Sequence, residues 1–151
     1  VVGNDEKAHL AAATLLLTYP GVPSIFAGDE LGIEGAWGED SRRTIDWEHP
    51  EKWNKKLHLG FKELIAIRKK HDALINGGLR WIHISEDSIA YIRESKKETI
   101  LVFASRSATK AKIDLAPYGY KISKTLYGTE KSGSKFSISS KDATSGIWIL
   151  K

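Results

Sequence analysis

The spacing of the apolar residues changes at Gly77-Gly78, and this change predicts two kinds of structure in one chain. Before it, the apolar residues of 51–71 recur at the i, i+4, i+8 spacing of one helical face, with lysines mostly on the other face. After it, the apolar residues alternate with a period of two, as they do in strands. We therefore predict a unit over 1–77 that contains the helices and an all-β unit over 78–151.

The second part is predicted to contain seven strands, which lie at 79–84, 88–93, 99–104, 110–115, 120–126, 134–139 and 145–150. Residues typical of turns separate them. Short strands at spacings of about ten residues are typical of an antiparallel β-sandwich, here with expected Greek-key connections. Its aromatic residues mostly occupy alternating positions typical of a core, namely Trp81, Tyr91, Phe103, Tyr118, Tyr120, Tyr127, Phe136 and Trp148.

The first part begins with a predicted helix over 5–18, for which Asn4 is the expected N-cap. This helix is apolar on nearly every side, which indicates that it lies inside a larger structure. Pro20-Gly21 ends it, and Val22 to Phe26 is predicted to form a short buried strand. A long polar loop over 28–49 follows, and loops of this length inside compact domains are usually functional. Pro50 suits the first turn of the next helix.

The segment from Gly21 to Gly32 resembles the eighth barrel strand of the α-amylase family, glycoside hydrolase family 13. That family carries a Gly-x-Pro-x-Ile-x-x-Gly-x-Glu pattern, which is matched here by Gly21, Pro23, Ile25, Gly28 and Glu30. The stretch Ser41-Arg42-Arg43-Thr44-Ile45-Asp46-Trp47 is similar to a motif of the neopullulanase and oligo-1,6-glucosidase branches. The predicted sandwich also matches the C-terminal domain of the family in position and size.

The resemblance implies an α+β chain that holds the last β/α elements of a (β/α)8 TIM barrel, followed by an antiparallel Greek-key β-sandwich. Residues 22–27 would be the eighth strand and 51–71 the eighth helix. One strand and two helices cannot close such a barrel, and an apolar strand is unstable in water when unpaired. The missing N-terminal barrel portion is thus an expected partner. Without it, we expect residues 8–27 to self-associate or to pack on the sandwich in an arrangement foreign to the family.

The resemblance also implies a retaining glycosidase of carbohydrate metabolism whose substrate is an α-glucan or maltooligosaccharide. Retaining enzymes need two carboxyl groups about 5–5.5 Å apart. In the family the catalytic carboxylates follow the fourth, fifth and seventh strands, which would all precede Val1. We therefore expect no catalytic residue in this chain and no activity of the chain alone. In the alternative interpretation, residues 78–151 are a non-catalytic module that binds carbohydrate or braces the barrel.

Asp29 and Glu30 are candidate site residues, because the C-terminal ends of barrel strands face the active centre. The resemblance places both near the floor of that centre. Glu30 either hydrogen-bonds the neighbours that hold the catalytic groups or fixes the Gly28–Gly32 turn. Asp29 is expected in the same turn rather than in contact with substrate.

Two residues of the following loop are candidate substrate contacts. Arg42 matches an arginine that contacts sugar in neopullulanase-like relatives, although Gly38 replaces the aspartate that usually precedes it by four positions. Its alternative role is a salt bridge that pins the loop. Trp37 either stacks on a sugar ring or packs within the loop. Two further tryptophans, Trp47 and Trp53, are predicted to be core residues.

Composition excludes several other functions. Apolar residues make up 41% and charged residues 28% of the chain, which is typical of a globular protein. The net charge is +4, but lysines and acidic residues are interleaved, so a nucleic-acid partner is not expected. No apolar run is long enough for a membrane span. The five histidines lack a ligand spacing, so no metal or cofactor is expected. The absence of cysteine fits a reducing compartment such as the cytoplasm.

Overall fold

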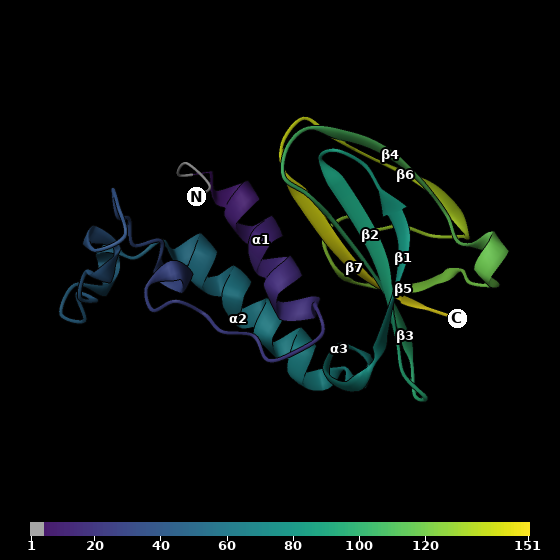
Figure 1. The fold of residues 1–151 in the computed structure, drawn as a ribbon, viewed down its shortest axis with the longest axis horizontal. Helices are drawn as coiled ribbons and strands as arrows, with labels where there is room; N and C mark the ends of the chain where they lie inside the picture. Colours follow the sequence, from purple (N-terminus) through teal and green to yellow (C-terminus); the bar gives the residue numbers. More distant parts are fainter. Residues whose placement is uncertain (1–4) are drawn as a thin grey trace.

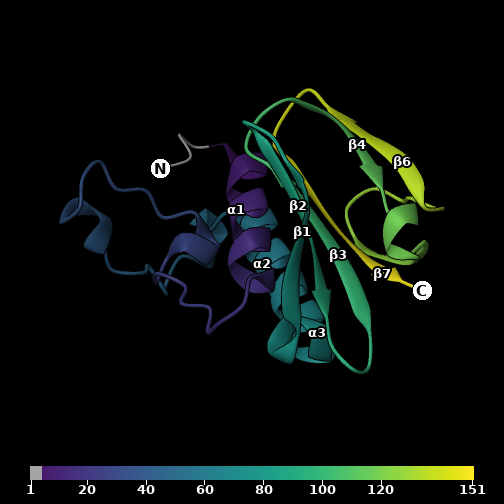
Figure 2. The same ribbon diagram turned by 45° about the vertical axis from the view of Figure 1, so that its right-hand side comes forward.

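The computed structural model describes residues 5–151, which form three layers (Figures 1 and 2). The helical layer consists of α1 (Glu6–Thr18), α2 (Lys55–Lys70) and α3 (Asp72–Asn76). The strands are β1 (Gly78–Ile84), β2 (Ser88–Glu94), β3 (Thr99–Ser105), β4 (Thr109–Asp114), β5 (Ile122–Tyr127), β6 (Lys135–Ser140) and β7 (Thr144–Leu150). All seven predicted strands are present, and none of their ends differs by more than two residues from the prediction.

The strands form two antiparallel sheets. The larger sheet has the order β1-β2-β3-β7-β5, and the smaller one pairs β4 with β6. From β3 to β7 the chain changes sheet at every step, so β3 and β7 become hydrogen-bonded neighbours although three strands separate them in sequence. The prediction of an antiparallel sandwich is confirmed.

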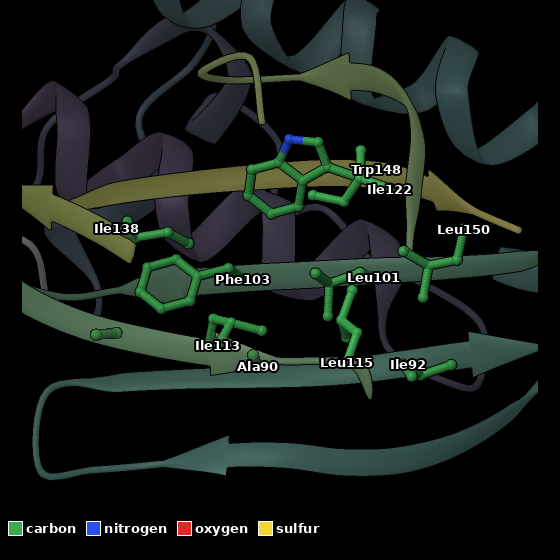
Figure 3. Packing of buried hydrophobic residues seen from close by; sticks show 11 residues of the cluster. Ala90, Ile92, Leu101, Phe103, Ile113, Leu115, Ile122, Ile138, Trp148 and Leu150 are labelled. Carbon is green, nitrogen blue, oxygen red and sulfur yellow. The ribbon is translucent and has the colours of Figure 1, made fainter. Parts of the chain in front are cut away.

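The core of the sandwich lies between the two sheets (Figure 3). Side chains of β3 and β7, among them Phe103 and Trp148, pack toward Ile113 of β4 and Ile138 of β6. Each strand contributes every second residue, because alternate side chains of a strand point to opposite faces. The predicted core positions are confirmed for Phe103 and Trp148 but not for Trp81 and Tyr118, which are exposed.

A second core lies on the opposite face of the larger sheet, where α1, α2 and α3 pack. It joins helical residues such as Leu17, Phe61 and Leu64 to Val102 and Ile147 of the sheet. A side-chain hydrogen bond of 2.9 Å between Thr14 and Ser145 also links α1 to β7. The helical and all-β parts of the chain therefore share one buried layer. None of the helices in residues 5–151 has the length and apolar character needed to cross a bilayer.

Both long helices start at residues other than those predicted. The N-cap of α1 is Asp5, whose carboxylate accepts from the backbone N–H groups of Lys7 and Ala8 at 2.8 and 3.1 Å. The expected cap, Asn4, lies outside the described residues. The second helix starts at Lys55 because the side chain of Asn54 caps it, and Pro50 instead begins a separate 3-10 turn.

The strand predicted over residues 22–26 is not formed. The segment is not helical, but it pairs with no strand of the described chain. The side chain of Val22 is 96% exposed and that of Phe26 is 53% exposed. A strand needs a hydrogen-bonded neighbour, and both sheets of this structure are built from residues 78–150. The apolar sequence is sufficient to predict a strand, but the described residues contain no strand that pairs with it.

Candidate functional site

A cleft of about 890 Å³ lies beside the N-terminal half of α1 and the turn that follows residues 22–26. Its walls come from α1, the turn, the next loop and the start of α2, and they comprise Asp5, Glu6, His9, Ala12, Phe26, Asp29, Gly32, Ile33, Glu34, Gly35, Ala36, Trp37, Gly38, Arg43, Asn54 and Leu57. The cleft thus brings together Asp29 and Trp37, two of the four candidate residues. Glu30 and Arg42 do not line it.

The turn is a 3-10 helix over Asp29–Leu31 between two glycines in the left-handed region. Gly28 has φ 103° and Gly32 has φ 71°, which only glycine adopts without strain. A carboxylate oxygen of Glu30 accepts from the backbone N–H of Gly28 at 2.9 Å. Of the two roles considered for Glu30, this contact supports the one in which its carboxylate fixes the turn.

The loop after the turn is closed by Asp40. One carboxylate oxygen accepts from the backbone N–H of Ala36 at 2.8 Å and from Nη2 of Arg43 at 2.7 Å. The other oxygen accepts from Nε of Arg43 at 3.0 Å. These hydrogen bonds, that of Arg43 first, hold the pKa of Asp40 below its usual value, while Asp40 raises the pKa of Arg43. The ion pair that pins this loop is therefore made by Arg43 and not, as the alternative for Arg42 required, by Arg42.

Arg43 is the site residue that sequence reasoning missed. It lines the cleft, whereas the adjacent Arg42 is an exposed residue at the end of a 3-10 turn. The spacing of Asp40 and Arg43 was the available signal, because side chains three residues apart meet in a helical turn.

The tryptophans of the loop differ in exposure. Trp37 is 62% exposed and faces the cleft, so its indole is accessible to a ligand. Trp47 is 68% exposed, and the prediction that it is a core residue is wrong. It packs edge to face on the half-buried Trp53, with ring centroids 5.5 Å apart. The loop projects away from the sandwich (Figures 1 and 2), and the Trp53 ring also lies 6.0 Å from that of His58 in α2.

The Asp40 contacts predict a pH-dependent loop. Because the folded pKa of Asp40 is lowered, its stabilising contacts are fully present above its ordinary value of 3.8. They are lost as the pH falls through the lower folded pKa. We expect the ¹⁵N and ¹H shifts of the Ala36 amide to titrate with a midpoint below pH 3.8, measured by NMR between pH 7 and pH 2. The transition should disappear in Asp40→Asn, and a midpoint at or above 3.8 would contradict the described contact.

Within residues 5–151, no cluster of three or more His, Asp or Glu side chains has the arrangement of a metal site. The polar side chains that line the cleft are carboxylates, the His9 imidazole, the Asn54 amide, one guanidinium group and an exposed indole. These groups suit hydrogen bonding and stacking with a polar, ring-containing ligand.

Parts of several known enzymes are similar in sequence to this chain. Residues 79–133 match the family model described as the maltogenic amylase C-terminal domain. A cyclomaltodextrinase of Geobacillus thermopakistaniensis is 32% identical over 117 residues, which are 76% of this chain and 20% of that protein. Neopullulanase 2 of Thermoactinomyces vulgaris is 32% identical over 127 residues, which are 74% of this chain and 21% of that protein. The chain spans about a fifth of the length of these relatives.

Solved structures share the whole arrangement. A debranching enzyme from Nostoc punctiforme is similar with a TM-score of 0.80 and 26% identity, over 97% of this chain and 32% of that chain. A trehalulose synthase from Pseudomonas mesoacidophila shares the fold, with a TM-score of 0.77 and 21% identity, over 96% of this chain and 38% of that chain. The similarity extends over the helices as well as the strands. The expectation that residues 8–27 pack in an arrangement foreign to these proteins is therefore wrong. Self-association through residues 8–27 stays a prediction.

Proposed function

Because this chain belongs to the α-amylase family of glycoside hydrolases, as the C-terminal part of such an enzyme, we propose that it supplies one wall of an α-glucan-binding cleft. In this proposal residues 22–26 are the last strand of the barrel of a retaining glycosidase. The catalytic carboxylates come from the rest of that enzyme, and the chain alone is inactive. The substrate is an α-glucan or a maltooligosaccharide.

The cleft beside the unpaired segment is the observation that carries the proposal. It contains an acidic turn and an exposed indole, and Phe26 of the unpaired segment belongs to its wall. Val22 and Phe26 are exposed, although burying such side chains stabilises a protein by about 1.5–3 kcal/mol each. A neighbouring barrel strand would bury them and complete the cleft on its open side.

Each candidate residue has a definite role in this proposal. The indole of Trp37 stacks on a sugar ring, and the exposed guanidinium of Arg42 donates to a pair of sugar hydroxyls. Glu30 and Asp29 hold the turn that forms the floor beside the reacting groups. Arg43 and Asp40 keep the loop that carries Trp37 closed.

Binding of maltoheptaose to the chain tests the proposal. One wall of a cleft should bind weakly, with a Kd of about 1 mM, which corresponds to roughly −4 kcal/mol. We expect Trp37→Ala to weaken this binding at least tenfold in an NMR titration and Trp47→Ala, a change at an equally exposed tryptophan, to leave it intact. Equal affinity of the Trp37 variant and the parent chain would contradict the role of Trp37. Release of glucose or maltose by the chain would contradict its lack of catalysis.

A second candidate function is carbohydrate binding at β1 of the all-β part, which two neighbouring exposed aromatic residues favour. Tyr19, after α1, and Trp81 of β1 have ring centroids 6.3 Å apart, and both are partly exposed. If Trp81→Ala abolishes maltoheptaose binding and Trp37→Ala does not, this second function is the correct one. If none of these chains binds the sugar, the all-β part only braces the barrel.

A further inference from the structure

Two buried arginines reach the C-terminal end of α1 from different elements. Arg68 of α2 donates through Nη1 to the carbonyl oxygens of Leu17 at 2.8 Å and Tyr19 at 3.2 Å, and through Nη2 to that of Gly21 at 2.6 Å. Arg93 of β2 donates through Nη1 to the carbonyl oxygen of Thr18. Of the five residues from Leu17 to Gly21, all but Pro20 thus have a carbonyl oxygen that accepts from one of these two side chains.

This end of α1 requires cationic partners. The last carbonyl groups of a helix have no partner within the helix and form the negative end of its dipole. The last turn of α1 contains no basic residue of its own. The planar fork of an arginine side chain can bind several carbonyl groups at once, which a single lysine ammonium group cannot do with the same geometry. The two arginines therefore supply from other elements the basic groups that the last turn of α1 lacks.

Burial makes both contacts specific. The side chain of Arg93 is fully buried and that of Arg68 nearly so, and among the described residues no carboxylate pairs with either. Burial lowers the pKa of both guanidinium groups, and for Arg93 the charge of Arg68 adds to this effect. A buried charge is stable only when its donors are satisfied, here by backbone carbonyls. Any shift of the α1 end would leave these donors unsatisfied.

Further bonds of β2 hold the same region. Arg93 also donates to the carbonyl oxygen of Leu74 in α3 at 3.2 Å and to those of Gly77 at 2.8 Å and Gly78 at 3.2 Å, which follow α3. The hydroxyl of Tyr91 lies 2.6 Å from that of Thr18. Burial raises the pKa of Tyr91 to about 12, so its hydroxyl stays neutral and able to donate. One strand of the sandwich thus holds the ends of both α1 and α3.

The segment after Gly21 reaches the cleft without a strand partner. Residues 22–26 pair with no described strand, although Ile25 packs against the second core. Beyond the segment, the backbone N–H of Asn54 donates to the carbonyl oxygen of Leu31 at 3.0 Å. The position of the Gly28–Gly32 turn therefore depends on the packing of Ile25 and on the contacts at both ends of this segment.

We infer that Arg68 and Arg93 are positioning residues, which hold residues 17–21 so that α2 and the all-β part of the chain together set the position of the Gly28–Gly32 turn in the cleft. The sandwich thus takes part in shaping the site, in addition to covering the helices. The position of the backbone at residues 17–21 does not depend on a ligand. Its consequence for sugar binding rests on the function proposed above.

Amide hydrogen exchange followed by NMR tests the inference on the chain itself. The amides of Tyr19, Leu31 and Ile33 are suitable probes because each donates a backbone hydrogen bond near an end of the segment. We expect Arg68→Gln to raise their exchange rates at least tenfold and to leave the amides of β3 and β7 unchanged. Arg68→Lys, which keeps the charge but loses the fork, should give an intermediate rise. Unchanged rates at all three amides in Arg68→Gln would overturn the inference.

Two further variants complete the test. Arg106→Gln is the matched control, because Arg106 is an exposed arginine at the opposite end of the larger sheet. Its Nε donates to a carboxylate oxygen of Asp87 at 2.8 Å. It should change none of the three rates. If Arg93→Gln does not fold, Tyr91→Phe tests the same side of the helix end, and it should raise the Tyr19 rate severalfold. An unchanged Tyr19 exchange rate in Tyr91→Phe would overturn the inference that β2 helps to hold the end of α1.

Maltoheptaose affinity separates the inference from the proposed function. If the parent chain binds the sugar, Arg68→Gln should weaken binding severalfold while Arg106→Gln does not. If the parent chain binds no sugar, the proposed glucan contact fails, and the exchange rates still decide whether the arginines position the turn. Faster amide exchange with unchanged maltoheptaose affinity would mean that the two arginines stabilise only the end of α1. That result would overturn their link to the cleft.

Discussion

Replacement of Trp148 by alanine is expected to lower the free energy of unfolding by about 3–5 kcal/mol, the usual cost of removing a large aromatic side chain from a core. Trp148 is 2% exposed and lies between the two sheets (Figure 3). The ring of Phe136 lies 6.0 Å from the indole of Trp148. Its indole N–H donates to the carbonyl oxygen of Thr129 at 3.1 Å. The substitution therefore removes apolar contacts and the hydrogen bond of the indole N–H.

Gly146 increases this expected effect. A Cβ atom at Gly146 would lie 2.2 Å from the Trp148 ring, so the indole already occupies the space beside the neighbouring backbone. Alanine at position 148 leaves that space empty, because a close-packed interior relaxes only partially around a cavity. Since domains of this size are stable by about 5–15 kcal/mol, the variant should lose a large fraction of its stability.

Trp47→Ala is the matched control for this prediction. It makes the same chemical change at a side chain that is mostly exposed, and we expect a loss within about 0.5–1 kcal/mol. Urea unfolding followed by far-ultraviolet circular dichroism measures both variants against the parent chain. Similar losses for the two variants would show that Trp148 does not occupy the described core.

The second large effect is expected for Gly77→Ala. A Cβ atom at position 77 would lie 2.3 Å from the carbonyl oxygen of Ala73 and 2.9 Å from that of Glu94. Both neighbours are backbone atoms, which cannot move aside as the end of a flexible side chain can. Overpacking of this kind costs about 1–3 kcal/mol or more. The strain would also displace the Gly77 carbonyl to which Arg93 donates at 2.8 Å.

The adjacent glycine provides the control. A Cβ atom at Gly78 would have no heavy atom within 4 Å, so Gly78→Ala should change the free energy of unfolding by less than about 0.5 kcal/mol. Thermal unfolding of the two variants measures the difference, which for a chain of this length corresponds to several degrees in Tm. A Gly78 variant as unstable as the Gly77 variant would contradict the described junction between α3 and β1.

The strands could be predicted from sequence because their information is local. Each strand of the sandwich has apolar residues on one face or both and is bounded by turn residues, and a period of two is unlike that of a helix. The same holds for the turn over Asp29–Leu31, since Gly28 and Gly32 stand where only glycine tolerates the backbone angles. The family resemblance was carried by these spacings and was confirmed by the relatives.

The features that depend on distant partners could not be predicted in this way. Residues 22–26 have the composition of a buried strand but lack a neighbouring strand among the described residues. Trp47 has the hydrophobicity of a core residue but lies on a loop that projects from the body of the molecule. In both cases hydrophobicity indicates a tendency to be buried, and burial requires a surface that a single segment does not contain.

For the candidate site, the sequence alone determined the kind of residues and their order: the glycine-bounded turn with Asp29 and Glu30, and a loop with Trp37 and adjacent arginines. Only the tertiary structure decided which of them meet. It placed Trp37 and Arg43 in the cleft and Arg42 outside it. It also brought Arg68 and Arg93, 25 residues apart in the numbering (93 − 68), to the same end of α1. The physical reason is that local spacing limits the conformation of each segment, whereas the partner of a buried charge or an unpaired strand depends on how the whole chain packs.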